Sequence, residues 1–166
     1  MTQKLEKTSL EPTSCVASQY PPIMYNINRS ALVPYSDQKM FDLINDVDSY
    51  VDFLPWCGAS EILEDSGEVR VASITIAFKG VHKTFTTRNT LTPHSRIRLN
   101  MVDGPFSQLH GTWSFKALDD NACKISLDLD FDFSNRIVGA VIGPVFKIIA
   151  DSMIDSFCKR ADEVYG

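Results

Sequence analysis

Residues 122–133, ACKISLDLDFDF, decide the fold, because apolar and polar side chains alternate along the whole stretch. This period of two is typical of a β-strand with one face buried and the other face in water. The apolar face consists of Ile125, Leu127, Leu129, Phe131 and Phe133. The stretch therefore predicts a sheet with an apolar inner face and an acidic outer face.

The next segment, residues 134–164, changes to the period of an α-helix. Ser134 or Asn135 can cap its start, and Gly143-Pro144 predicts a kink. One apolar stripe is formed by Val138, Val141, Ile142, Val145, Ile149, Met153, Phe157 and Ala161. A helix of about 45 Å with such a stripe needs a large apolar partner. The inner face of the sheet is the partner that the sequence offers.

The segments upstream supply the rest of the sheet. A strand is predicted at 25–33, a helix after the N-cap Ser36, and a second short helix at 48–54 with Asp48 as its cap. Turn residues separate further strands at 59–64, 68–79, 82–92, 96–103 and 107–117. This order predicts an α+β protein. A curved antiparallel sheet of about seven strands wraps around a long C-terminal helix, and two short helices follow strand 1.

Length and composition are those of one globular domain. The chain has 166 residues, of which 44% are hydrophobic and 22% are charged. Residues 1–23 are polar and aperiodic and are predicted to be a disordered tail, which leaves 24–166 as a single domain. The apolar run at 137–146 is shorter than a membrane-spanning helix requires. The four cysteines are scattered without metal-binding spacing, which predicts reduced thiols in the cytoplasm.

Several separate motifs resemble one family. They are ALVPYSDQKMFDLINDVDSYVDFLPWC, KGVHKTFTTR, VDGPFSQLHGTWSF, ACKISLDLDFDF and FCKRADEVY. Across residues 27–165 the chain resembles the coenzyme Q-binding proteins of the START-like (polyketide cyclase/dehydrase) superfamily. Within that superfamily it also resembles the bacterial ribosome-association toxins. The resemblance implies a helix-grip fold with a deep apolar cavity between the sheet and the last helix.

Two functions follow from this resemblance, and both remain open at this point. The preferred one is a non-enzymatic protein that binds ubiquinone or a similar isoprenoid lipid and supports respiration. It would be cytoplasmic, with peripheral contact to the inner membrane. The alternative is a toxin that binds the large ribosomal subunit, blocks subunit joining and is controlled by an antitoxin protein.

The loop after the second short helix is unusually apolar. Pro55 ends that helix and leaves Phe53, Leu54 and Trp56 beside an irregular segment. We expect Phe53 and Trp56 to flank the cavity entrance and Leu54 to fill the core.

The wall of the cavity is predicted from the helix and the sheet. The small residues at 139, 140 and 143 would leave space, and Thr86, Arg88 and Asn89 would donate to a quinone carbonyl. The alternative for any single residue is that it packs in the hydrophobic core and does not contact a ligand. The predicted ligand-binding residues are Phe53, Leu54, Trp56, Phe85, Trp113, Phe115, Leu129, Phe131, Phe146, Ile149 and Met153.

Basic residues concentrate in one part of the chain. From residue 69 to residue 102 there are six basic residues and no acidic one, although the net charge of the chain is −5. A solvated sheet face is the alternative, but the absence of acid favours a surface for RNA phosphates or anionic lipid. The residues predicted to face the anion, and to lie near one another, are Lys79, Lys83, Arg88, Arg96 and Arg98.

No catalytic arrangement is recognisable in the sequence. The three histidines, His82, His94 and His110, belong to no nucleophile–base pattern. The acids at 128, 130 and 132 share one strand face. We predict that their carboxylates are exposed to water and do not bind a metal ion. We therefore predict no catalytic residue, no metal and no catalytic cofactor. A small-molecule cyclase would need a polar group in the cavity, for which His110 and Tyr50 are the candidates.

Overall fold

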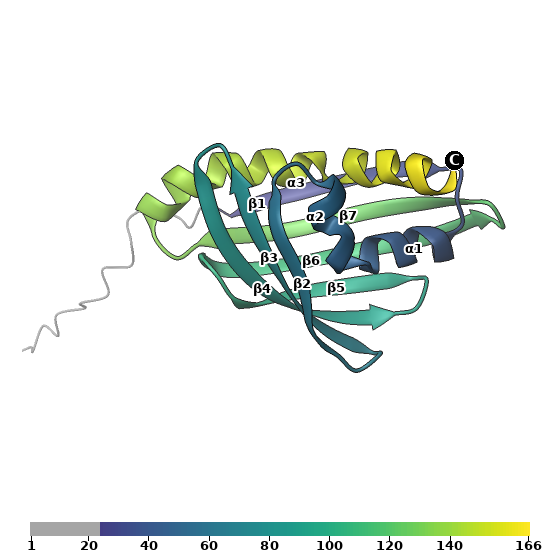
Figure 1. Cartoon of the computed structure of the whole chain (residues 1–166), viewed down its shortest axis with the longest axis horizontal. Helices are drawn as coiled ribbons and strands as arrows, with labels where there is room; N and C mark the ends of the chain where they lie inside the picture. The colour runs from purple at the N-terminus through teal and green to yellow at the C-terminus, as the bar shows by residue number, and fades with distance from the viewer. Residues whose placement is uncertain (1–23) are drawn as a thin grey trace, which may run out of the picture.

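The computed structural model describes residues 24–166, so the predicted tail lies outside the described residues. Seven antiparallel strands form one sheet in the order β1-β7-β6-β5-β4-β3-β2. The sheet curls around the long helix α3 (Figure 1). The strands are β1 (Tyr25–Val33), β2 (Cys57–Asp65), β3 (Val69–Phe78), β4 (Val81–Thr92), β5 (Arg96–Asp103), β6 (Phe106–Asp119) and β7 (Ala122–Phe133).

The helices also match the predicted order. They are α1 (Asp37–Asn45), the 3-10 turn η1 (Val47–Ser49), the short α2 (Tyr50–Phe53) and α3 (Arg136–Tyr165). The α+β arrangement predicted from the sequence, with a curved sheet around a C-terminal helix, is thus confirmed.

Helix α3 begins at the cap that the sequence offers. The Asn135 side chain accepts a hydrogen bond of 2.8 Å from the Val138 amide, and the helix continues through Pro144. From Ile142 onward its stripe is buried except for the half-buried Met153, but Val141 is 61% exposed, in contrast to the prediction. The first turns of α3 are covered by the sheet on one side only, where Phe133 packs against the helix.

We expected Gly139 and Gly143 to leave space beside α3, but neighbouring side chains fill that space. A Cβ added to Gly143 would lie 2.8 Å from Tyr25 Oη, and one added to Gly139 would lie 3.4 Å from the Phe133 side chain. These positions are small because β1 and β7 approach the helix closely there. The open space lies further along the helix.

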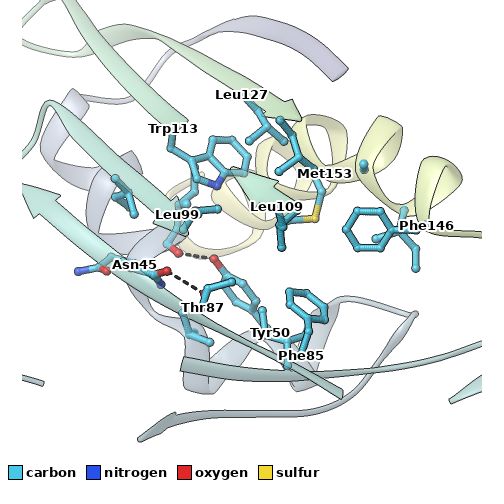
Figure 2. A pocket seen from close by; sticks show the side chains of 18 of the residues that line it. Asn45, Tyr50, Phe85, Thr87, Leu99, Leu109, Trp113, Leu127, Phe146 and Met153 are labelled. Carbon is cyan, nitrogen blue, oxygen red and sulfur yellow. Dashed lines mark hydrogen bonds between the residues drawn. The ribbon is translucent and has the colours of Figure 1, made fainter. Parts of the chain in front are cut away.

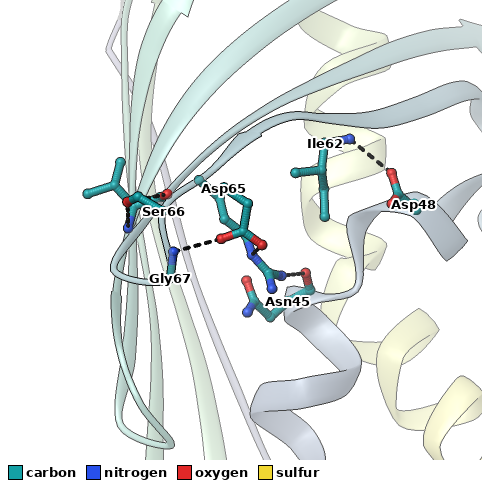
Figure 3. Close-up of polar contacts among 8 residues, drawn as sticks. Asn45, Asp48, Ile62, Asp65, Ser66 and Gly67 are labelled. Carbon is teal, nitrogen blue, oxygen red and sulfur yellow. Dashed lines mark hydrogen bonds and ion pairs between the residues drawn. The ribbon is translucent and has the colours of Figure 1, made fainter.

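The two short helices are fixed by different contacts. Ser36 caps α1 by accepting from the Lys39 amide at 3.2 Å. Asp48 does not act as the predicted cap of the second helix. Its Oδ1 accepts from the Ile62 amide at 2.9 Å and so ties η1 to β2 (Figure 3). Helix α2 ends at Phe53, and Leu54 is extended, as expected for a residue before proline.

Aromatic side chains dominate the core between α2, β6 and α3. Phe157 is fully buried, and its ring meets Tyr50, Phe53 and Trp113 with centroid distances of 5.2, 5.6 and 5.4 Å. Cys123 is also fully buried, and burial raises the pKa of its thiol to about 11. Among the described residues the cysteines are free thiols.

Helix α3 is long and apolar enough to cross a membrane by length and composition. The core helix of a globular domain meets the same criteria, and α3 buries Ile142, Ile149 and Phe157 inside the protein.

Candidate functional site

A cavity of about 80 Å³ lies between the inner face of the sheet, the end of α1 and the middle of α3 (Figure 2). Most of its wall is apolar. The lining residues are Ile44, Asn45, Val47, Tyr50, Trp56, Ile74, Phe85, Thr87, Asn89, Ile97, Leu99, Leu109, Trp113, Leu127, Leu129, Phe146, Ile149, Ala150 and Met153. The predicted space between sheet and last helix is therefore present.

Two polar side chains in this wall, Thr87 and Tyr50, donate hydrogen bonds to other groups of the protein. Thr87 Oγ1 donates to Asn89 Oδ1 at 2.8 Å, and the Tyr50 hydroxyl donates to the Ile44 carbonyl (Figure 2). Burial, followed by the charges of Asp46 and Cys57, raises the pKa of Tyr50 well above its usual range. The Tyr50 phenol therefore stays protonated and is not suited to acid–base catalysis at neutral pH.

Two other polar atoms in the wall have no hydrogen-bond partner in the described chain. They are Asn45 Oδ1, at the end of α1, and Trp56 Nε1, just before β2. The Trp56 side chain is only 4% exposed. The expected position at the cavity entrance is therefore wrong for Trp56, because the residue packs inward as part of the wall.

A polar junction lies beside the cavity, at the backbone of Asn45. Arg70 Nη1 donates to the Asn45 carbonyl at 2.9 Å, and Arg70 Nε pairs with Asp65 at 2.9 Å (Figure 3). Asp65 also accepts from the Gly67 amide at 2.9 Å. The end of α1 is thus attached to the β2–β3 hairpin.

The structure brings seven of the eleven predicted ligand-binding residues to the cavity. These are Trp56, Phe85, Trp113, Leu129, Phe146, Ile149 and Met153. The other four lie elsewhere. Phe53 packs against Arg160, with 4.9 Å from the guanidinium carbon to the ring centre, and Leu54 is buried in the core. Phe115 packs on Phe41, and Phe131 is enclosed by other aromatic rings.

The polar candidates on β4 are divided by strand alternation. Phe85, Thr87 and Asn89 point into the cavity, whereas Thr86 and Arg88 occupy the alternate, outward positions. The predicted hydrogen bonds from Thr86 and Arg88 to a ligand in the cavity are therefore wrong, and Thr87 was missed. Applying the period of two from Phe85 onward would have identified Thr87 and Asn89.

Three of the predicted anion-facing residues form one group on the outer face, which we call the arginine stripe: Arg88, Arg96 and Arg98. Arg98 pairs with Thr90 and Arg96 with Thr92 across β4 and β5. Arg88 is thus a diagonal neighbour of Arg98, with about 7–8 Å or slightly less between their Cβ atoms. All three are exposed, and among the described residues none of them forms an ion pair with a carboxylate.

The other two predicted cations lie away from the stripe. Lys79 is in the β3–β4 turn, roughly 23 Å along β4 from Arg88. Lys83 pairs with Ile76, which is buried, so its Cβ is on the opposite side of the sheet from Arg88. The expectation that all five cations lie together is corrected, because alternate residues of a strand face opposite ways.

The other titratable candidates, the acids of β7 and His110, do not line the cavity. Asp128 and Asp130 accept from Asn28 and Asn26 on the outer face. His110 is exposed on that same face, where its Nδ1 lies 3.0 Å from Asn100 Oδ1. His110 is thus excluded as a polar group of the cavity. In the described part of the chain, no cluster of three or more potential metal ligands is found.

The helix-grip fold and its internal cavity define a START-like protein. The family model described as polyketide cyclase/dehydrase and lipid transport matches residues 33–158. The chain belongs to this family.

The chain is also similar to individual proteins of known sequence or structure. The chain is 50% identical to the ribosome association toxin RatA of Pseudomonas aeruginosa, over 85% of this chain and 98% of that protein. It is 30% identical to the mitochondrial coenzyme Q-binding protein COQ10 of Drosophila melanogaster, over 80% of this chain and 56% of that protein. The crystal structure of the Streptomyces aromatase/cyclase Zhui superimposes with a TM-score of 0.74 at 19% identity. That match covers 84% of this chain and 94% of Zhui, and it concerns the fold alone.

Proposed function

We propose that this protein associates with the ribosome and inhibits translation by binding the large subunit. The observation that carries the proposal is the 50% identity, over nearly the full length of the relative, to a ribosome association toxin. Such a role places the protein in the cytoplasm, and the antitoxin implied by the family resemblance remains a prediction.

The arginine stripe is the surface that we assign to this association. Guanidinium groups bind phosphate oxygens in bidentate geometry, and their burial against RNA releases counterions. Arg88, Arg96 and Arg98 are exposed and form no ion pair with a carboxylate within residues 24–166, so phosphate contact would not require breaking such a pair. On the same outer face, the exposed Lys116 of β6 and Lys124 of β7 extend the positive surface beyond the stripe, whereas Asp128 and Asp130 of β7 lie two strands from β5.

Sedimentation with purified ribosomal subunits tests this proposal. The full-length protein should pellet with the large subunit at low salt and dissociate as the salt concentration rises. In sucrose gradients, extracts that contain excess protein should show fewer joined ribosomes and more free subunits. Unchanged profiles, together with no co-sedimentation at low salt, would reject the proposal.

A second function is favoured by the cavity: non-enzymatic binding of an apolar ligand, for which ubiquinone remains our candidate. The wall is apolar apart from a few amide, hydroxyl and indole groups, as an isoprenoid quinone requires. At about 80 Å³ the cavity is smaller than the roughly 300–1,000 Å³ of typical ligand pockets. Binding therefore requires movement of the wall, and the flexible Met153 is the best-suited lining residue on α3.

The first turns of α3 offer a route for such a ligand to reach the protein. Ile137, Val141 and Ile148 are exposed apolar side chains on this helix. They support the predicted peripheral contact with a membrane, from which an isoprenoid lipid would be taken.

Filling the cavity should reduce ligand retention. In Ala150→Leu the added carbons would enter the cavity, because Ala150 is buried and lines it. We expect about tenfold less quinone in solvent extracts of the purified protein, measured by mass spectrometry, since overpacking costs about 1–3 kcal/mol.

The matched control is Lys159→Leu, which adds an apolar side chain at an exposed position near the end of the same helix, away from its first turns, and should keep the ligand. The absence of quinone or other lipid from the wild-type extract, together with no uptake of added quinone, would reject this second function.

A further inference from the structure

The cavity contains a donor and an acceptor that the protein itself does not satisfy. Asn45 Oδ1 and Trp56 Nε1 both belong to lining residues, and both atoms are buried without a hydrogen-bond partner in the described chain. The Asn45 and Trp56 residues are 8% and 4% exposed. The other polar side chains of the wall, Tyr50, Thr87 and Asn89, engage in the hydrogen bonds described above.

Such atoms are unusual inside proteins. Most buried polar groups are paired, because an unpaired donor or acceptor loses its water without compensation. Here both lie in the wall of a single cavity, whereas the third unpaired buried atom, Arg160 Nε, belongs to a residue outside that wall. A ligand that pairs with Asn45 and Trp56 would remove the penalty, so these atoms describe the polar part of the ligand.

The two atoms require complementary groups. The indole N–H of Trp56 needs an acceptor, whereas the amide oxygen of Asn45 needs a donor. A carbonyl can satisfy only Trp56, but a hydroxyl can both accept and donate. A hydroquinone carries a hydroxyl at each end of its ring, so one hydroxyl can serve both atoms or each can serve one.

The rest of the wall limits the ligand further. Among the described residues that line the cavity there is no Asp, Glu, Lys, Arg or His. A charged head group would be buried there without a counterion, at high cost. The aromatic rings of Tyr50, Phe85, Trp113 and Phe146 border the space and favour a flat ring.

We propose that the cavity binds a neutral ring with hydroxyl groups on an apolar body, of the phenol or hydroquinone class, through Asn45 and Trp56. The proposal rests on the second function above, since it assumes that the cavity takes an apolar ligand. It adds that the hydroquinone form binds more tightly than the corresponding quinone.

The test compares two probes that differ only in the oxidation state of the ring. A benzoquinone with a ten-carbon chain, and its hydroquinone kept reduced by dithionite under argon, are titrated into the full-length protein by calorimetry. We expect the hydroquinone to bind about tenfold more tightly, the effect of one additional satisfied buried hydrogen bond.

Variants assign the preference to the two atoms. Asn45→Leu should weaken hydroquinone binding about tenfold and leave quinone binding unchanged, whereas Trp56→Phe should weaken both. Asn45→Leu removes an unpaired buried acceptor, so its melting temperature should equal or exceed that of the wild type. Asn100→Leu on the outer face is the control and should bind both probes normally.

The possible outcomes separate the two proposals. If neither probe binds the wild type, the apolar-ligand function itself fails. If both probes bind equally and Asn45→Leu changes nothing, the cavity takes an apolar ligand but the proposed hydroxyl recognition is wrong. If Asn45→Leu cannot be purified folded, Trp56→Phe still decides, because unaltered binding of both probes would overturn the role of its N–H.

Discussion

Reversing the charge of Arg88 and Arg98 together should abolish ribosome association while the fold stays intact. The two side chains are diagonal neighbours on the outer face of β4 and β5 and are exposed. The double variant Arg88→Glu/Arg98→Glu changes the local charge by four units and places carboxylates where phosphates would lie. We expect affinity for the large subunit to fall about 100-fold or more at low salt, with a shallower dependence on salt concentration.

The control carries the same change of charge at another place. Lys39→Glu/Lys159→Glu alters two exposed lysines, on α1 and α3, outside the arginine stripe. This variant should co-sediment with the large subunit nearly as well as the wild type. Both double variants change exposed side chains only, so each should change the free energy of unfolding only slightly. If both double variants lose binding equally, net charge rather than the arginine stripe is responsible.

Truncating Phe157 should cause the largest loss of stability. The side chain is fully buried on α3 and packs edge-to-face with Tyr50 from α2 and Trp113 from β6. Phe157→Ala removes these contacts and leaves a void that rigid strands cannot close. We expect the free energy of unfolding to fall by about 3–5 kcal/mol, measured by urea denaturation followed by circular dichroism.

An exposed apolar residue on the same helix provides the comparison. Val164→Ala, near the end of α3, should change the free energy of unfolding by no more than about 0.5 kcal/mol. A loss below about 1 kcal/mol for Phe157→Ala would mean that the aromatic cluster does not hold α3 against the sheet.

The secondary structure could be predicted because its causes are local. The period of two fixes which side chains of β7 point inward, and Asn135 and Pro55 act on their immediate neighbours. The cap at Asp48 failed because a distant group competed for the same side chain. The amide of Ile62, fourteen residues further on, takes the Asp48 carboxylate.

The outward position of the arginine stripe was within reach of the sequence. Once Phe85 is assigned to the inner face, alternation places Arg88 on the outer face and Lys83 on the opposite side of the sheet, where Lys83 is exposed near the start of β4. Which outward strand positions become neighbours depends on register, and the β4–β5 pairing brings Arg88 beside Arg98. Register comes from contacts between strands, which a single sequence does not display.

The sequence by itself determined the order of strands and helices, the apolar face of the sheet and its partner α3. Only the tertiary structure decided which inward side chains border the cavity. Leu129 and Phe131 lie on the same face of β7, yet only Leu129 lines the cavity. Phe131 is covered by Tyr25 from β1 and Phe146 from α3. Whether an apolar residue meets another side chain or open space depends on packing between segments that are distant in the sequence. The alternation along one strand does not reveal this packing.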